Sequence, residues 1–279
     1  ERLLGTEPLT LLLKAQAAQI SGDRDAAESA FQRMVDDPET RVLGLRGLFV
    51  EARRREDEGA ARAYAAEAAR LAPSVTWANE AVLEAQCADG EWSAATETVE
   101  RRAALGLMDK NAARRQRAVL LTAAAQRHEA GEPDTATEQA LKAVKLAPDL
   151  VPAAVIAGRL LARRNDLRKA AKILEAAWKA TPHPELAKVY LNLRTGDSAR
   201  DRLARAENLA KLSSWDPESR LVIAQAATEA KDFARAREAL APLADDRPTA
   251  RVCRMMARIE AAEHGAESGR SREWLARAA

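Results

Sequence analysis

Two stretches of this chain align with each other at a spacing of 34 residues, which constrains the fold more than any other feature. Ala140 and Pro148 in the first stretch correspond to Leu174 and Pro182 in the second. Each stretch reads as a helix–turn–helix unit closed by a proline, because proline cannot continue the hydrogen-bond ladder of a helix. A unit of this size cannot bury its own apolar face. The 279 residues are therefore expected to stack about eight such units.

This period, with small residues where two helices cross, resembles the tetratricopeptide repeat. The resemblance implies an all-α fold, a right-handed α-α superhelix of about eight helix pairs that covers residues 1–279. Hydrophobic residues make up 47% of the chain and aromatic residues only 4%, so small and aliphatic side chains must fill the core. The predicted pairs are 9–20 with 24–35, 39–55 with 59–71, 75–88 with 92–105, 110–130 with 134–146, 150–163 with 167–180, 184–194 with 198–212, 218–230 with 233–243, and 249–264 with a short helix near 270–278.

Three residues carry specific local predictions. Gly158 occupies the glycine position at which the two helices of a repeat cross. The third pair has no closing proline, and Gly106 is expected to end it in the left-handed conformation. Asp109 is then a predicted N-cap for the next, unusually long helix. Near 106–110 the array can divide into N-terminal repeats (1–105) and C-terminal repeats (110–279).

Charge and motifs argue against several classes of function. The 44 basic and 42 acidic residues leave a net charge of +2, whereas a nucleic-acid-binding domain is expected to be strongly basic. The three histidines stand apart from the two cysteines and from one another, and no metal-ligand spacing occurs. No nucleophile elbow, zinc-protease or phosphate-binding motif is present. We expect a non-enzyme with neither a metal nor a required cofactor.

The predicted binding surface is the concave face that the first helices of the pairs build. An arginine-rich face suits an acidic peptide or a C-terminal carboxylate, because arginine binds carboxylates bidentately. The alternative interpretation is a solvated helix face with arginine–glutamate pairs at helical spacing. The candidate partner-binding residues are Arg46, Arg53, Arg54, Trp77, Glu84, Leu121, His128, Arg159, Arg163, Tyr190 and Arg194.

Longer strings, which the repeat itself does not require, occur in a characteristic order at residues 7–19, 37–48, 109–123, 256–260 and 272–278. Together they resemble the HemY family of proteobacterial tetratricopeptide proteins, in the form found in α-proteobacteria. This resemblance implies a protein held in the bacterial inner membrane by two N-terminal helices, with repeats facing the cytoplasm and a role in haem biosynthesis without assigned catalysis. The resemblance also implies that the anchor and a short C-terminal tail lie outside this sequence, which opens at Glu1 without methionine and is expected to be a fragment or processed form.

Three functions follow as hypotheses. The first is a scaffold that gathers or regulates haem-biosynthesis enzymes at the membrane through the concave face. The second is a porphyrin or haem carrier; its candidate iron ligands include His128 and Met108, whereas the Met255–Met256 pair favours core packing. The third is a general peptide-binding adaptor unrelated to haem. The arginine clusters at 53–55, 101–102 and 114–117 could also meet anionic lipid headgroups.

Overall fold

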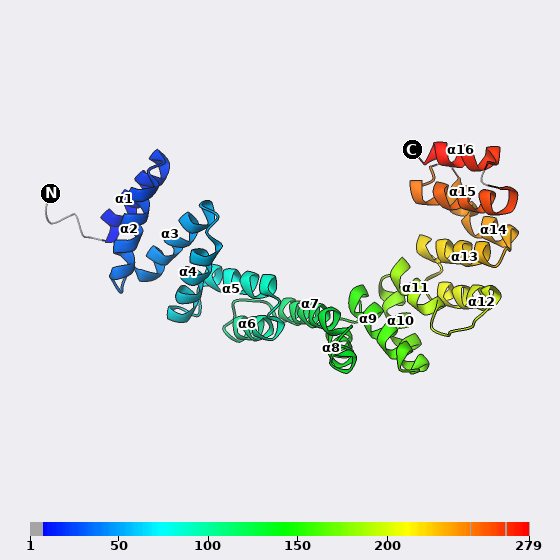
Figure 1. Ribbon diagram of the computed structural model, residues 1–279, viewed down its shortest axis with the longest axis horizontal. Helices are drawn as coiled ribbons and strands as arrows, with labels where there is room; N and C mark the ends of the chain where they lie inside the picture. Colours follow the sequence, from blue (N-terminus) through cyan, green and yellow to red (C-terminus); the bar gives the residue numbers. More distant parts are fainter. Residues whose placement is uncertain (1–7, 246, 266, 279) are drawn as a thin grey trace. The chain divides into compact units, whose positions relative to one another are not determined.

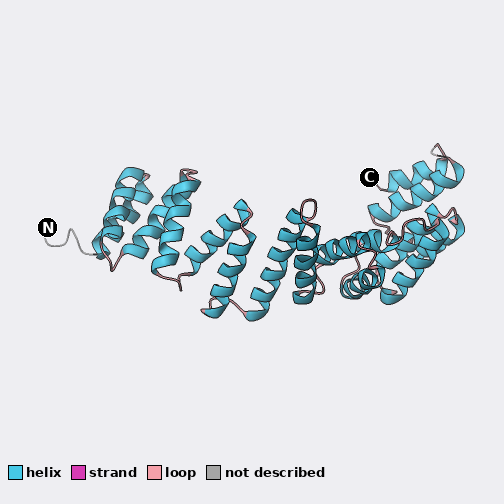
Figure 2. Ribbon diagram, turned by 60° about the horizontal axis from the view of Figure 1, so that its bottom comes forward, coloured by secondary structure: helices cyan, strands magenta, loops and turns pink. Residues whose placement is uncertain are grey.

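The structure is a computed structural model that describes residues 8–245, 247–265 and 267–278. Every regular element in these residues is helical, and short loops join one helix to the next (Figure 2). The all-α prediction is therefore confirmed, and all sixteen predicted helices are present with ends that differ by a few residues. The helical array divides by its internal contacts into two compact units that end and begin at Leu120 and Leu121. The division that the sequence suggests at 106–110 lies earlier and stays a prediction, as does the right-handed sense of the array.

Unit 1 consists of three helix pairs and the first part of α7 (Figure 1). Each helix packs against the next one in the chain from α1 to α6. Alanines pack where the helices cross, and larger side chains such as Phe31, Met34 and Leu48 fill the spaces between pairs. The helices are α1 (Pro8–Ser21), α2 (Arg24–Asp36), α3 (Arg41–Arg54), α4 (Glu58–Leu71), α5 (Thr76–Asp89), α6 (Trp92–Ala104) and α7 (Lys110–His128).

Unit 2 continues from α7 with nine helices and one short 3-10 turn. Its main core surrounds Trp178 and Leu174, both of which are fully buried. The first helices of successive pairs form a row, because α9 packs against α11, α11 against α13, and α13 against α15. The elements are α8 (Pro133–Leu146), α9 (Val151–Arg163), α10 (Leu167–Ala180), α11 (Pro184–Leu191), α12 (Ala199–Ala210), the turn Lys211–Ser213, α13 (Pro217–Glu229), α14 (Phe233–Ala244), α15 (Ala250–His264) and α16 (Gly269–Arg277).

One turn recurs between the two helices of a pair. A residue in the left-handed conformation is followed by an acidic residue that begins the second helix. In unit 1 the left-handed residues are Gly22, Glu56 and Gly90, which lie 34 residues apart. Asp23 and Asp57 then accept hydrogen bonds from the backbone three residues on, at 3.0 and 2.9 Å. In unit 2 Asn165 and Lys231 take the same conformation ahead of capping aspartates.

The local predictions at the glycines are confirmed. A Cβ atom added at Gly158 would lie 2.9 Å from both methyl groups of Leu174, so α9 and α10 could not cross as closely with a side chain there. Gly106 has φ of +71° directly after α6, as a left-handed helix end requires. Asp109 caps α7, because its Oδ1 accepts hydrogen bonds from the backbone N–H groups of Asn111 and Ala112.

Candidate functional site

A groove of about 750 Å³ runs along α9 and α11 in unit 2. Its wall is apolar where Val155 and Ile156 of α9 face Val189 of α11 and the neighbouring Leu193. Polar and charged side chains stand around this wall, which suits a ligand with an apolar centre and polar ends. The lining residues are Gln126, Pro152, Val155, Ile156, Arg159, Ala162, Arg163, Glu185, Lys188, Val189, Asn192, Leu193 and Thr195.

The groove lies beside the unusually short helix α11. The helix has eight residues, against thirteen in α9, and ends at Leu191 rather than at the predicted Arg194. Asn192 ends the helix and its side-chain amide donates to the carbonyl oxygen of Lys188. Leu193 then packs into the core with 6% of its surface exposed. The groove therefore reaches past the end of α11, where Leu193 and Thr195 complete its wall.

Two arginines on the edge of the groove share one carboxylate. Arg159 donates from Nε and Nη2 to the two carboxylate oxygens of Glu129, at 2.7 and 2.5 Å. Arg163 Nη1 lies 3.4 Å from the same carboxylate. The side chain of Glu129 is only 15% exposed, whereas those of Arg159 and Arg163 are 41% and 60% exposed. The pair predicted to hold a partner's carboxylate thus already holds one from this chain. Lys188 adds a further positive charge to the groove.

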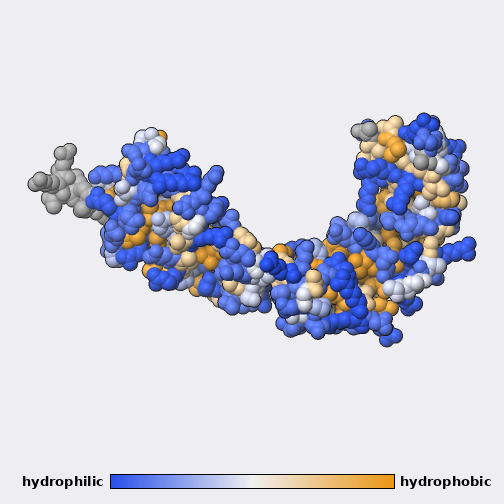
Figure 3. Space-filling view, viewed as in Figure 1, coloured by the Kyte–Doolittle hydropathy of each residue, from blue (hydrophilic) through white to orange (hydrophobic). Residues whose placement is uncertain are grey.

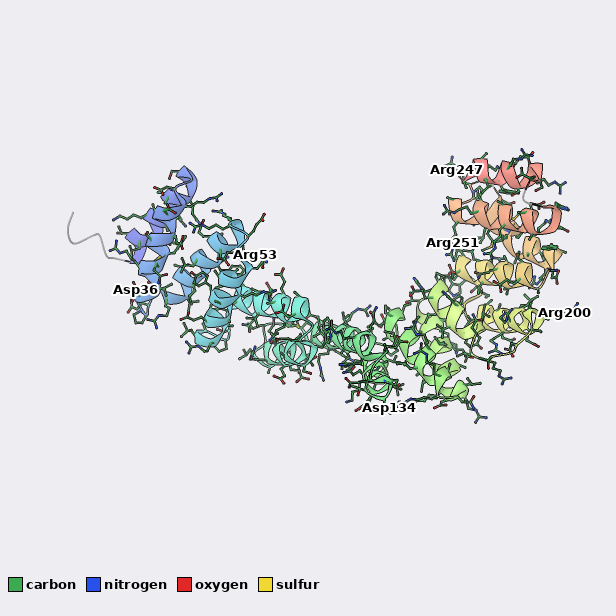
Figure 4. The ribbon with its side chains drawn as sticks, viewed as in Figure 1. Asp36, Arg53, Asp134, Arg200, Arg247 and Arg251 are labelled. Atoms are coloured by element: carbon green, nitrogen blue, oxygen red, sulfur yellow. The ribbon has the colours of Figure 1, made fainter. Side chains whose placement is uncertain are left out.

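In unit 1, the predicted residues Arg53 and Glu84 lie together beside a smaller hollow. Arg53 of α3, labelled in Figure 4, lies 3.4 Å from Glu58 and 3.6 Å from Glu84 of α5. With Phe49 they line a hollow of about 70 Å³. This volume has room for water but not for a peptide side chain of ordinary size, and the arginine is satisfied within the unit.

The other candidates from unit 1 and from α7 do not join these sets. Arg54 pairs with Glu51 of its own helix at 3.1 Å. Trp77 packs against Phe49 with ring centroids 5.2 Å apart and is half-buried. Arg46 is exposed on α3, and Leu121 is half-buried on α7.

His128 and Tyr190 make contacts to second helices of the pairs. His128 ends α7, and its Nδ1 lies 3.0 Å from Oε1 of Gln139 on α8. Tyr190 is buried and donates its hydroxyl hydrogen to Glu175 of α10 at 2.7 Å. Burial, followed by this hydrogen bond, raises the pKa of Tyr190 to about 12. Arg194 lies after α11 and lines a separate hollow together with Tyr190.

Several residues of the groove were not predicted. Lys188, Val189 and Leu193 line the groove but are absent from the predicted set, as is Glu129, which pairs with two arginines at its edge. A signal for two of them was present, because Val189 and Leu193 lie 34 residues after Val155 and Arg159. The string Thr195-Gly196-Asp197 also indicates that the sixth pair's first helix ends early. Gly196 does take a positive φ of +90° there.

The arginines of this chain act mainly as cross-links between helices. Most ion pairs that arginine makes in the described residues join neighbouring helices or adjoining turns rather than positions three or four apart on one helix. The rigid guanidinium fork suits such cross-links. Figure 4 labels Arg53, Asp134 and Arg251, which belong to three of them. The pairs include Arg55–Glu28, Arg62–Asp89, Arg102–Glu80, Arg117–Glu100, Arg164–Asp134, Arg235–Glu207, Arg237–Glu260 and Arg251–Glu218.

The described residues offer neither a cluster of metal ligands nor a membrane-spanning helix. Histidine, cysteine and acidic side chains form no group in residues 8–245, 247–265 and 267–278 that could hold a metal ion. None of the helices described there combines the length and the apolar composition needed to span a bilayer. On the face shown in Figure 3, most of the surface of each unit is hydrophilic.

Comparisons with known proteins return structures of the same repeat class. No family model matches the chain, and no curated protein matches it. A tetratricopeptide repeat protein from Parabacteroides merdae is 14% identical over 89% of this chain and 98% of its own, with a TM-score of 0.38. The tetratricopeptide domain of P58(IPK) is 17% identical over 96% of both chains, with a TM-score of 0.30. From its own period, turns and crossing glycine, this chain is an all-α protein of tetratricopeptide-like helix pairs.

Proposed function

We propose that this protein is a non-catalytic scaffold that binds a segment of another protein in the groove between α9 and α11. The groove supports this proposal because it has a volume of about 750 Å³ and an apolar wall framed by polar and charged side chains. Such an arrangement accepts an aliphatic or aromatic anchor and fixes its orientation through the rim. The row of first helices from α9 to α15 would extend the contact surface on one side.

The finer proposal is that the bound proteins are haem-biosynthesis enzymes and that the scaffold works at the bacterial inner membrane. It is supported by the ordered strings that resemble the HemY family, and by nothing in the groove itself. An N-terminal anchor and a cytoplasmic location belong to the same proposal. A general adaptor with partners outside the haem pathway would use the same groove in the same way.

Capture of purified haem-biosynthesis enzymes by the immobilised chain tests the scaffold. Val189→Asp places a charge in the apolar wall and should abolish capture, whereas Val119→Asp, at a side chain 49% exposed on α7, should not. Equal capture by both variants would rule out the groove as the binding site. If unrelated proteins are captured and their capture depends on Val189, the groove is the binding site and the haem-pathway proposal is rejected.

A porphyrin carrier remains the second candidate, because the same groove could hold a flat apolar ring whose carboxylates meet Arg163 and Lys188. The lining residues include no histidine, methionine or cysteine, so a haem would be held through its carboxylates rather than its iron. Titration with haem and with metal-free protoporphyrin, followed in the Soret band, distinguishes this function. A saturable shift that Val189→Asp removes supports a carrier, and its absence at micromolar ligand rejects it.

A further inference from the structure

A second hollow, of about 500 Å³, adjoins the groove where α11 ends. It lies between the first turns of α10, one side of α12 from Asp201 to Asn208, and the end of α11 with the segment that follows it. Leu193 lines both hollows, so the two share a wall at this side chain. A segment bound in the groove beside Leu193 therefore lies next to the wall that borders the second hollow.

Two arginines in this hollow lack a partner. Arg205 pairs with Asp197, and Asp201 is engaged by the backbone and hydroxyl of Ser198, which lower the pKa of Asp201. Arg168 and Arg194 line the same hollow, and neither makes an ion pair or side-chain hydrogen bond with any described residue. The arginines of the α9–α11 groove differ, because Glu129 already engages both. The second hollow thus offers two guanidinium groups that are free to bind.

The backbone adds to the positive potential. Leu167 and Arg168, which line the hollow, form the start of α10, whereas α12 lines it along its length from Asp201 to Asn208. The N-terminal end of a helix carries a partial positive charge, so the start of α10 adds to the attraction for an anion. Asp197 and Asp201 reduce this potential but each is already paired. A singly charged carboxylate is repelled less by these two aspartates than a doubly charged phosphate would be.

We propose that this hollow is a carboxylate subsite, which binds an acidic side chain of the same partner segment whose apolar side chain lies in the α9–α11 groove. The proposal rests on the proposed function and adds a sequence preference to it. The recognised segment contains an aliphatic residue followed or preceded at short range by aspartate or glutamate. Arg168 and Arg194 bind the carboxylate, and Leu193 separates the two subsites.

Fluorescent peptides with defined sequences test the subsite by anisotropy. The first series carries one leucine and a pair of glutamates, separated by glycine–serine spacers of increasing length and in both orders. The second series has glutamine for glutamate, and the third has serine for leucine. Each series is measured on the whole chain, on Arg168→Gln with Arg194→Gln, and on a control with Arg254→Gln and Arg258→Gln. The control arginines are exposed on α15.

We expect the best glutamate peptide to bind about tenfold more tightly than its glutamine counterpart. The Arg168→Gln, Arg194→Gln variant should abolish this preference and leave the glutamine peptides unaffected, while the control variant keeps the preference. The preference should also shrink as the ionic strength rises from about 0.01 to 1 M, because salt screens the attraction between the arginines and the carboxylate.

The outcomes separate the subsite from the groove. If glutamate and glutamine peptides bind equally and leucine is still required, the carboxylate subsite is rejected and the groove is retained as the binding site. A glutamate preference that persists without Arg168 and Arg194 places the carboxylate elsewhere and overturns the assignment. Binding that does not require leucine rejects the groove and with it the proposed function.

Discussion

Glu129→Gln is the most informative single change, because it should weaken the fold and strengthen acid binding at the same time. Glu129 directly follows α7, where the partial negative charge of the helix end disfavours a carboxylate. It is held there by the two hydrogen bonds from Arg159 and by Arg163 at 3.4 Å. Glutamine keeps the shape of the side chain and removes the charge that attracts both arginines.

The free-energy cost of losing this ion pair lies between two known limits. Exposed ion pairs contribute about 0.2–1 kcal/mol, and breaking a fully buried pair costs about 3–5 kcal/mol. Glu129 is 15% exposed but Arg159 is 41% exposed, so we place the loss at about 1–2 kcal/mol. Removing the carboxylate from the helix end returns about 0.3–1 kcal/mol. The expected net destabilisation is therefore about 1 kcal/mol.

A double-mutant cycle measures the interaction directly. Urea unfolding of Glu129→Gln, Arg159→Gln and the double variant should give a coupling energy of about 1 kcal/mol or more. A coupling below about 0.3 kcal/mol, which is the usual scatter of additivity, would refute the argument. In peptide binding the same change should act in the opposite direction. Freed Arg159 becomes available to a partner's carboxylate, so Glu129→Gln should bind acidic peptides several-fold more tightly. Weaker binding would show that Glu129 itself contacts the ligand.

Three further predictions concern stability. Burial, together with the hydrogen bond to a neighbouring carboxylate, raises the pKa of Tyr190 to about 12, against about 10 in an unfolded chain. The stability that this group supplies is present below about pH 10 and is lost as the pH rises towards 12, so Tyr190→Phe should flatten that part of the Tm profile. An unchanged slope would show that another group is responsible. Ala157→Asp buries an unpaired charge at a position with no exposed surface and should cost about 3–5 kcal/mol, whereas Ala276→Asp on exposed α16 should change stability by less than about 0.5 kcal/mol in urea unfolding. Gly158→Val should cost about 1–3 kcal/mol because the new Cβ meets Leu174, and a thermal melt equal to that of the unmodified chain would contradict the close helix crossing.

The helix pairs could be predicted because their ends carry local signals. Proline, glycine and capping aspartates act on the backbone within a few residues, so all sixteen helices were placed correctly from sequence. The regular turn of unit 1 was harder to see, because its left-handed position holds glycine at 22 and 90 but glutamate at 56. A glutamate carries no sequence signal for that conformation. Proline spacings vary in this part of the chain, whereas the turn keeps its 34-residue period.

The candidate site was predictable only in part. The repeat rule located Arg159 and Arg163, which do line the groove. Whether these arginines are free depends on Glu129, which lies 30 residues from Arg159 in the sequence and meets it only through the packing of α7 against its neighbours. Tyr190 and Arg194 lie beside the second hollow and not in the groove, because they stand 35 residues after Val155 and Arg159, one position beyond the period. Val189 and Leu193, which stand at the period itself, line the groove.

The short α11 also determines where local unfolding is expected to begin. In a linear array, each pair is held only by its neighbours, and a short helix has few internal hydrogen bonds to protect its amides from local opening. With eight residues, α11 has fewer turns than any other first helix described in the chain. The amides of residues 184–197 should exchange with solvent before those of the adjoining helices, and limited proteolysis should cut first after Arg194. A bound partner that spans the groove would slow both processes, so protection of this one segment would report occupancy without any knowledge of what the partner is.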